Sequence, residues 1–293
     1  MDKKRKRSRI RLLIQAVSAA VSNGYLRGFA RGRIYTGITK SVCVPGMNCY
    51  SCPGALGACP IGALQAVLNA RQFRLTLYVL GTLTVFGTLL GRAVCGFLCP
   101  FGLLQDLLYR IPFVRKLRRL PGEKFLRFAR YFFLAVFVIL LPMVVADAAG
   151  VGDPWFCKYV CPVGTLEGGI PLVLANRSLR AAVGFLYTWK LTILGVILLL
   201  SAVLFRPFCR YLCPLGALYG LFNRFALYRY RVDAKKCVDC GACQKACRLD
   251  IPVWKEPNSI DCIRCGACRD ACPTGAITTE YGRKKHKAGP KPR

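Results

Sequence analysis

Long apolar runs alternate along this chain with short basic and cysteine-bearing segments, and three of the runs are long enough to cross a membrane. They cover about residues 75–94, 128–148 and 182–205, each near the ~20 residues that a helix needs to span ~30 Å of hydrocarbon. Lys190 interrupts the third run near one end, where its amine is expected to reach the interface; a functional charge inside the membrane is the alternative. The pattern predicts an α-helical membrane bundle.

The loops between these runs predict an orientation. Residues 110–130 contain eight Lys or Arg and residues 149–181 contain three, and strongly basic loops stay on the cytoplasmic side. Residues 3–11 are also strongly basic, so both ends of the chain should be cytoplasmic. Three spans cannot place both ends on one side, and a fourth span at residues 12–30 is therefore expected. This stretch could instead lie flat at the interface or be the core of a signal peptide.

Composition agrees with a membrane protein, with 54% hydrophobic residues and a mean hydropathy of +0.38. The formal net charge of +31 would also suit nucleic-acid binding. However, Lys and Arg concentrate beside the apolar runs, at residues 3–11, 110–130 and 282–293. We therefore expect contact with membrane lipid and no nucleic-acid partner.

These patterns divide the chain into four parts. Residues 1–74 form a basic N-terminus with the stretch 12–30 and a cysteine-rich loop at 43–59, and residues 75–230 form the membrane domain. Residues 231–281 are polar and dense in cysteine, which predicts a compact α+β domain held together by metal. Residues 282–293 form a basic tail.

Two cysteine runs in residues 231–281 give the most specific chemical signal. They are Cys237-x2-Cys240-x2-Cys243-x3-Cys247 and Cys262-x2-Cys265-x2-Cys268-x3-Cys272-Pro273. The pair closely resembles the bacterial two-cluster ferredoxin, although Arg248 stands where that family usually has Pro. The resemblance implies a ferredoxin-like domain with two [4Fe–4S] clusters, the first held by Cys237, Cys240, Cys243 and Cys272, and the second by Cys262, Cys265, Cys268 and Cys247. Zinc would instead require isolated four-cysteine sets.

A second motif, C-x3-C-P, lies beside the apolar runs at Cys95/Cys99, Cys157/Cys161 and Cys209/Cys213. Each copy continues as C-P-x-G, which also recurs at Cys59 and Cys272, so the chain contains an internal repeat. Proline starts a short helix whose amides and positive dipole end face the sulfurs and favour thiolates. We expect these six cysteines to bind metal, with their pairing open; buried free cysteine is the alternative.

The third set is Cys43, Cys49, Cys52 and Cys59, which is compact enough to hold one cluster. A disulfide is the alternative if this loop faces outward. With four spans, Cys95/Cys99 and Cys209/Cys213 would lie inside, and Cys157/Cys161 and the cysteines of the loop 43–59 would lie outside. One or two further iron–sulfur clusters, forming a relay across the bilayer, are therefore expected.

The C-x3-C-P repeats followed by the ferredoxin-like domain resemble the NapH/NosR/CcoG group of membrane polyferredoxins over residues 75–280. This resemblance implies a multi-pass protein of the prokaryotic cytoplasmic membrane, with a cytoplasmic C-terminus, that passes single electrons between a cytoplasmic redox partner and a quinone pool or outer-face partner. Other membrane oxidoreductase subunits are further candidate partners. A quinol- or metal-ion-reducing enzyme and a cluster-bearing assembly subunit are the alternatives.

Other cofactors lack ligands in the sequence. The single histidine is His286, so haem is not expected. No Ser-Gly-Ala-Thr type motif for covalent flavin attachment occurs, and no residue marks a catalytic site. An electron-transfer component is therefore favoured over an enzyme with its own substrate.

Overall fold

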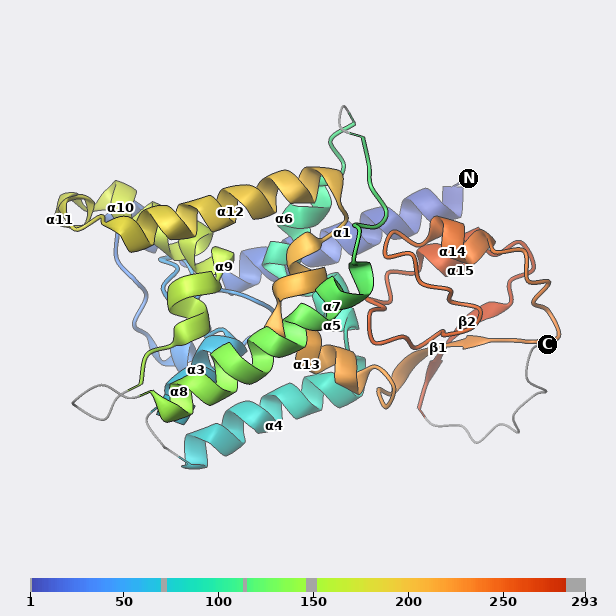
Figure 1. Cartoon of the computed structure of the whole chain (residues 1–293), viewed down its shortest axis with the longest axis horizontal. Coiled ribbons are helices and arrows are strands. Elements are labelled where there is room, and N and C mark those ends of the chain that lie inside the picture. Colours follow the sequence, from blue (N-terminus) through green and yellow to red (C-terminus); the bar gives the residue numbers. More distant parts are fainter. Residues whose placement is uncertain (1, 70–72, 113–114, 146–151, 283–293) are drawn as a thin grey trace.

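Helices that run lengthwise build the larger part of the structure, and a small sheet lies at one end (Figure 1). The computed structural model describes residues 2–69, 73–112, 115–145 and 152–282. Its α-helices are α1 (Asp2–Ser22), α2 (Leu26–Arg31), α3 (Pro60–Asn69), α4 (Phe73–Leu90), α5 (Ala93–Phe97), α6 (Pro100–Leu108), α7 (Glu123–Phe132), α8 (Leu141–Val144), α9 (Pro162–Gly164), α10 (Ile170–Ala175), α11 (Arg177–Ala181), α12 (Phe185–Val203), α13 (Pro214–Phe222), α14 (Ala242–Ala246) and α15 (Ala267–Ala271). A 3₁₀ helix, η1 (Ile38–Ser41), and four π-helical stretches, η2 (Phe133–Leu140), η3 (Phe156–Val160), η4 (Thr165–Gly169) and η5 (Phe208–Leu212), complete the helical part.

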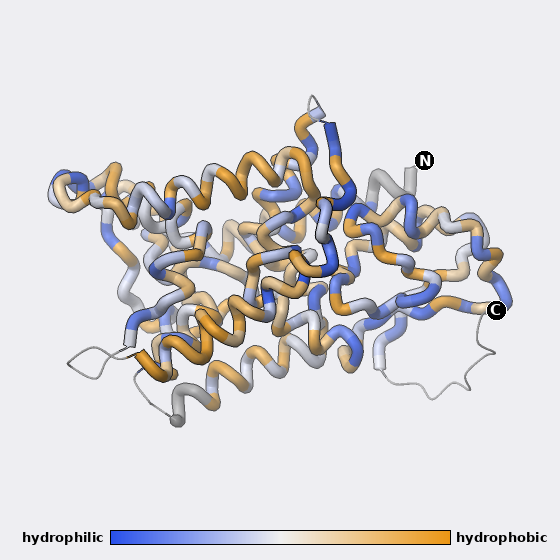
Figure 2. Tube along the Cα trace, in the orientation of Figure 1, coloured by the Kyte–Doolittle hydropathy of each residue, from blue (hydrophilic) through white to orange (hydrophobic). Residues whose placement is uncertain are grey.

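Two helices of the described residues are long and apolar enough to cross a membrane, so the expectation of three spans plus a fourth is wrong. The first runs from Glu123 to Val144 through α7, η2 and α8, and the second is α12. They correspond to the predicted runs 128–148 and 182–205, although residues 146–148 lie outside the described residues. Apolar residues occur along the length of both helices (Figure 2).

The predicted span at residues 75–94 is not among these two helices. Its helix is α4, which does not continue to the end of the predicted run. The helix ends at Leu90, where Gly91 adopts a left-handed φ of +54°. The residues that follow turn away into α5 and are buried. An apolar run therefore continued in sequence after its helix had ended.

The predicted span at residues 12–30 is divided between two helices. Helix α1 ends at Ser22 and α2 begins at Leu26. Arg11 and Gln15 of α1 are buried, and Arg11 pairs with Asp106 of α6 at 2.9 Å. Because α1 packs its polar residues against α5 and α6, its apolar positions do not form one continuous span.

The N-terminal helix touches the C-terminal domain, since Arg7 of α1 forms an ion pair with Asp270 of α15. Figure 1 shows the N-terminal end of α1 beside α14 and α15.

The C-terminal cysteine runs lie in sequence between the two strands of an antiparallel sheet. Strand β1 (Tyr228–Val232) pairs with β2 (Ile277–Tyr281), with Tyr228 opposite Tyr281 and Val232 opposite Ile277. The short helices α14 and α15 contact each other between the strands. Most of the predicted basic tail, residues 283–293 with His286, lies outside the described residues.

Candidate iron–sulfur centres

All eighteen cysteines are free thiols, and sixteen of them gather in four groups of four. We name the groups quartets A to D in order from the sheet end of the molecule. Quartet A is Cys237, Cys240, Cys243 and Cys272, and quartet B is Cys247, Cys262, Cys265 and Cys268. Quartet C is Cys95, Cys99, Cys209 and Cys213, and quartet D is Cys49, Cys59, Cys157 and Cys161.

Quartets A and B each line a small cavity with apolar walls in the C-terminal domain. Val232 and Trp254 help to line the cavity of quartet A, and Phe205 and Tyr230 that of quartet B. In each quartet three cysteines come from one run and the fourth from the other. These are the same sets that the ferredoxin resemblance implies, and their role as cluster ligands stays a prediction.

Two glycines shape the chain around these cavities. Gly241 and Gly266 follow the second cysteine of each run and adopt left-handed φ angles of +68° and +86°. Only glycine takes this conformation without steric cost. The tight turn lets the following residues fold back so that the third cysteine of each run faces the cavity.

Quartet C joins two C-x3-C-P motifs from distant parts of the chain. Cys99 and Cys213 precede the prolines that begin α6 and α13, and the amide of Gly216 donates to Cys213 Sγ at 3.3 Å. Burial raises the pKa of Cys99 and of Cys213, and the neighbouring thiols of the quartet raise it further. Four thiolates in so dry a space need compensating positive charge, which bound iron would supply.

Quartet D joins the third C-x3-C-P motif to the cysteine-rich loop. Cys161 precedes α9 and Cys59 precedes α3, while Cys157 lies on η3. A Cβ atom on Gly62 would lie 3.9 Å from both Cys157 Sγ and Cys59 Cβ, so the absence of a side chain there leaves room between the thiols. Cys49 and Cys59 of the loop therefore lie with Cys157 and Cys161, and the four loop cysteines do not form a group of their own.

Cys43 and Cys52 lie outside the four quartets. Cys43 forms an isolated strand-like bridge with Ala58, and Cys52 Sγ lies 3.4 Å from Asn23 Oδ1. Both are buried. The predicted N-terminal set thus separates into two quartet members, Cys49 and Cys59, and two spare thiols.

The copies of C-x3-C-P in η3 and η5 share an unusual backbone. The amides of Cys161 and Cys213 donate to the carbonyls of Phe156 and Phe208, five residues earlier, at 2.9 Å in both copies. This is a π-helical turn, a form that often occurs at functional sites. It carries the first cysteine of each motif, Cys157 or Cys209, beside its partner.

Two glutamines that the cysteine motifs did not indicate contact sulfurs of quartets C and D. Gln105 Nε2 donates to Cys209 Sγ at 3.2 Å, and its Oε1 accepts from the amide of Phe208 at 3.2 Å. Gln65 makes the same pair of bonds in quartet D, to Cys157 Sγ at 3.2 Å and from the amide of Phe156 at 3.0 Å. Each glutamine follows the glycine of its C-P-x-G motif by three residues, which is a signal that a longer repeat alignment would have shown.

Two charged side chains also face quartet D. Glu167 accepts a hydrogen bond from the amide of Cys49 at 2.7 Å, and burial raises the pKa of this carboxyl to about 7. Lys190 Nζ donates to the carbonyl of Cys157 at 3.0 Å. The amine of Lys190 is thus directed at the site, and the expectation that it reaches the interface stays a prediction.

Close contacts join quartet B to quartet C. Asn223 donates to the carbonyl of Cys262 at 2.8 Å and accepts from the amide of Arg92 at 2.9 Å. Arg92 in turn donates to the carbonyl of Cys209 at 2.9 Å. Gly96 lies in sequence between Cys95 and Cys99. Its backbone is so close to Ile263 that an added Cβ atom would be 2.5 Å from the carbonyl oxygen of Ile263.

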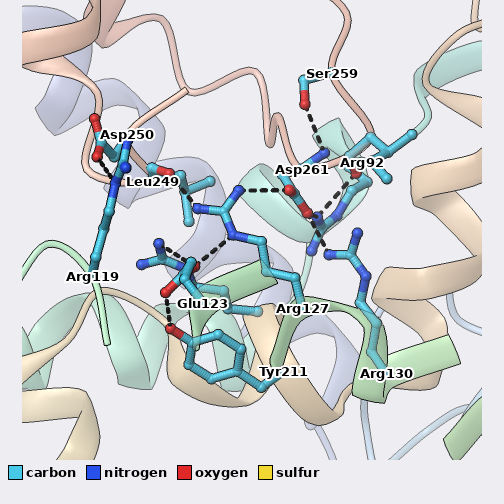
Figure 3. Close-up of polar contacts among 12 residues, drawn as sticks. Arg92, Arg119, Glu123, Arg127, Arg130, Tyr211, Leu249, Asp250, Ser259 and Asp261 are labelled. Carbon is cyan, nitrogen blue, oxygen red and sulfur yellow. Dashed lines mark hydrogen bonds and ion pairs between the residues drawn. The ribbon is translucent and has the colours of Figure 1, made fainter. Parts of the chain in front are cut away.

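Buried ion pairs surround this junction (Figure 3). Asp261, which precedes Cys262, accepts hydrogen bonds from Arg127 at 2.7 Å and Arg92 at 3.3 Å and forms an ion pair with Arg130 at 2.6 Å. The arginines hold the pKa of Asp261 at about 2 although burial opposes its ionisation. The segment beside quartet B is thereby fixed to α7 and α5.

The donor sets fit [4Fe–4S] clusters, which take four cysteine thiolates each. Backbone and side-chain N–H groups reach the sulfurs in quartets C and D, as cluster sites require. Within the described ranges no three His, Cys, Asp or Glu side chains converge closely enough for a single metal ion. In quartets A and B the four thiols line a cavity, which suits a multi-iron cluster.

Family comparison agrees with these donor sets. A family model described as a 4Fe-4S binding domain matches residues 57–78, 75–121, 131–172 and 187–231, more than half of the chain. The chain belongs to this 4Fe-4S binding family. A second model of the same description matches residues 257–278. Each of the four segments contains one C-P-x-G copy that borders quartet C or D, so the chain binds iron–sulfur clusters.

Individual relatives extend this result to electron transport. The chain is 30% identical over 60% of its length to an uncharacterized protein of Methanocaldococcus jannaschii, 29% over 66% to YccM of Escherichia coli, and 31% over 65% to MauN of Methylorubrum extorquens. YccM is named as an electron transport protein and MauN as a methylamine utilization ferredoxin-type protein. The chain spans 59%, 50% and 55% of these relatives, respectively. No solved structure matches it.

These relatives confirm the resemblance to membrane polyferredoxins that the cysteine motifs indicated. The chain is an iron–sulfur protein of an electron-transport family, and two of its helices suit a membrane.

Proposed function

We propose that the chain holds one [4Fe–4S] cluster in each of quartets A to D and passes single electrons along this row. Each cluster would supply a one-electron carrier. The observation that carries the proposal is the order of the quartets. Each of quartets A and B takes its fourth cysteine from the run that supplies the other three cysteines of its neighbour. Quartets B and C are joined through Asn223 and Arg92. In Figure 1 the elements that bear the quartets follow one another from α14 and α15, through α5, α6 and α13, to α3 and α9.

Quartet A is the proposed site of exchange with a redox partner in solution. Cys240 is exposed, and Val238 beside it is 65% exposed. The neighbouring Lys235 and Lys236 are exposed as well. One-electron transfer requires the partner to approach the carrier closely, and the basic surface favours an acidic partner.

Quartet D is the proposed exit toward the membrane. It lies at the end of the helical body away from the sheet (Figure 1), where a quinone or a partner on the outer face would exchange electrons with it. We place the chain in a prokaryotic cytoplasmic membrane with the C-terminal domain in the cytoplasm, because α1 and residues 110–130 are strongly basic. After removal of the clusters, an impermeant thiol reagent should then leave Cys240 unlabelled in intact cells and label it in opened ones.

Iron analysis after anaerobic purification tests the number of clusters. At four irons per cluster we expect about sixteen irons in the wild-type protein. Cys209→Ser and Cys157→Ser should each lose about four of them, since one membrane quartet is broken in each variant. Cys43→Ser and Cys52→Ser are matched controls, because these buried cysteines belong to no quartet, and they should keep the full content. About eight irons in the wild-type protein would leave clusters only in quartets A and B and would overturn the proposal.

A further inference from the structure

A short segment of the cysteine-rich loop, Pro45–Cys49, lies between quartets C and D. Two consecutive residues of this segment contact cysteines of different quartets, since Gly46 lies against Cys99 and Met47 lies against Cys59. Its central residue, Met47, is 2% exposed, and the next residue, Asn48, is completely buried. A buried segment in this position is available to connect the two sites.

On one side the segment packs against quartet C. A Cβ atom on Gly46 would lie 3.0 Å from Cys99 Cα and 3.1 Å from the carbonyl oxygen of Leu98. Glycine therefore allows the backbone to approach Cys99 closely. The next residue is Met47, so its backbone lies beside Cys99.

On its other side the same segment reaches quartet D. Met47 Sδ lies 3.8 Å from Cys59 Sγ. As a cluster ligand Cys59 would be a thiolate, so the sulfur–sulfur approach would be a van der Waals contact. The following residue is Cys49, itself a member of quartet D.

Tyr219 holds this segment in place. Its hydroxyl donates to the carbonyl of Pro45 at 3.0 Å, and its side chain is 1% exposed. It occupies, in the C-P-x-G repeat of α13, the position that Gln105 occupies in α6. The phenol contacts the loop backbone where Gln105 contacts a ligand sulfur.

We propose that Pro45–Cys49 is the bridge that couples quartets C and D electronically, with Met47 as its contact residue and Tyr219 as its positioning residue. The bridge consists of the backbone at Gly46, which lies against Cys99, and the thioether of Met47, which contacts Cys59 Sγ. It rests on the proposed function, since it presumes a cluster in each quartet. One electron leaves one site as the other site gains it, and no covalent bond forms or breaks and no proton moves.

Spectroscopy on the intact protein tests this bridge. Met47→Leu keeps the side-chain volume and removes the sulfur, and Tyr219→Phe removes only the hydroxyl that holds Pro45. Met143→Leu is the matched control, because Met143 is 52% exposed at the far end of α8. Freeze-quench EPR after partial reduction should show exchange between clusters C and D several-fold slower in both test variants and unchanged in Met143→Leu. The iron content and the separate spectra of the two clusters should be retained.

A direct contact readout accompanies the kinetic one. In a Met143→Leu background, selenomethionine enriched in ⁷⁷Se labels Met47 and Met1 alone, and a hyperfine coupling to the cluster of quartet D is expected. This coupling should disappear when Met47→Leu is added.

The outcomes separate the bridge from the proposed function. Wild-type exchange rates in both Met47→Leu and Tyr219→Phe, with both clusters present, would overturn the bridge and leave the four-cluster row intact. A wild-type protein without clusters in quartets C and D would overturn both.

Discussion

Hydrogen bonds from single residues to the ligand sulfurs should set the potentials of the membrane clusters. Gln105 and Gln65 make equivalent bonds in quartets C and D. A donor to a ligand sulfur favours the reduced cluster, because that state carries more negative charge. Two equivalent residues at two sites allow each site to be changed separately.

Gln105→Leu is expected to lower the reduction potential of the cluster in quartet C and to leave quartet D unchanged. Loss of about 1 kcal/mol of preference for the reduced state corresponds to roughly 40 mV for one electron. Gln65→Leu should produce the reverse pattern. EPR-monitored redox titration measures both potentials, and equal shifts of both clusters in either variant would contradict the separate roles of the two glutamines.

The cysteines could be predicted from the sequence because their residue type and their spacing both recur. The glutamines could not, because the residue type at their position differs between copies of the repeat. The residue three positions after the motif glycine is Gln65, Gln105, Glu167 and Tyr219 in the four copies. No residue type marks this position throughout, although each side chain faces a quartet or the segment between two of them. The combination of Cys49 and Cys59 with Cys157 and Cys161 was likewise left open, since it depends on contacts between distant segments.

At the scale of elements, glycines in α5 and α13 let the C-terminal domain approach the helical body. A Cβ atom would lie 2.5 Å from the carbonyl oxygen of Ile263 at Gly96, and 2.8 Å from that of Ile260 at Gly220. Both carbonyls belong to the segment that carries Cys262. The distance between quartets B and C therefore depends on these helices having no side chain at the contact.

Gly96→Ala should force this segment away from α5 and destabilise the protein by about 1–3 kcal/mol, as expected for overpacking. Gly81→Ala in α4 is the matched control, because its Cβ atom would meet nothing within 4 Å, and alanine in a helix should be neutral or slightly stabilising. Thermal unfolding of the purified protein measures both effects. Equal stability of the two variants would show that Gly96 is not required for the contact.

Apolar runs predicted the two spanning helices and failed where helix ends and buried polar residues decide the structure. Residues 128–148 and 182–205 were found because each is apolar over most of its length. The run at 75–94 continued beyond Gly91, whose left-handed backbone ends α4. In residues 12–30 the break at Ser22 has no proline or charge cluster to mark it. The burial of Arg11 depends on a carboxylate almost a hundred residues away.

At the scale of the whole molecule, part of the large positive charge lies inside the protein. Arg130, Arg206 and Arg210 are at most 2% exposed, although Arg130 was counted with the basic loop that faces lipid in the sequence analysis. These arginines surround the junction of quartets B and C. Buried positive charge beside cysteine thiolates compensates the negative charge that clusters would bring, a role that composition alone could not distinguish from lipid binding.

Among single residues, Asp261 should contribute most to the contact between the C-terminal domain and the helical body. Asp261→Asn leaves Arg92, Arg127 and Arg130 without their shared carboxylate, and breaking a buried pair in this way costs about 3–5 kcal/mol. Because the pKa of Asp261 is lowered to about 2, its contribution is complete above pH ~4 and is lost as the pH falls toward 2. Asp153→Asn is the matched control, since Asp153 and its partner Lys158 are 33% and 36% exposed, and exposed pairs contribute at most about 1 kcal/mol. Thermal unfolding at pH 7 and limited proteolysis between residues 223 and 240 should both distinguish the variants. Losses of equal size would show that the three arginines are held by other contacts.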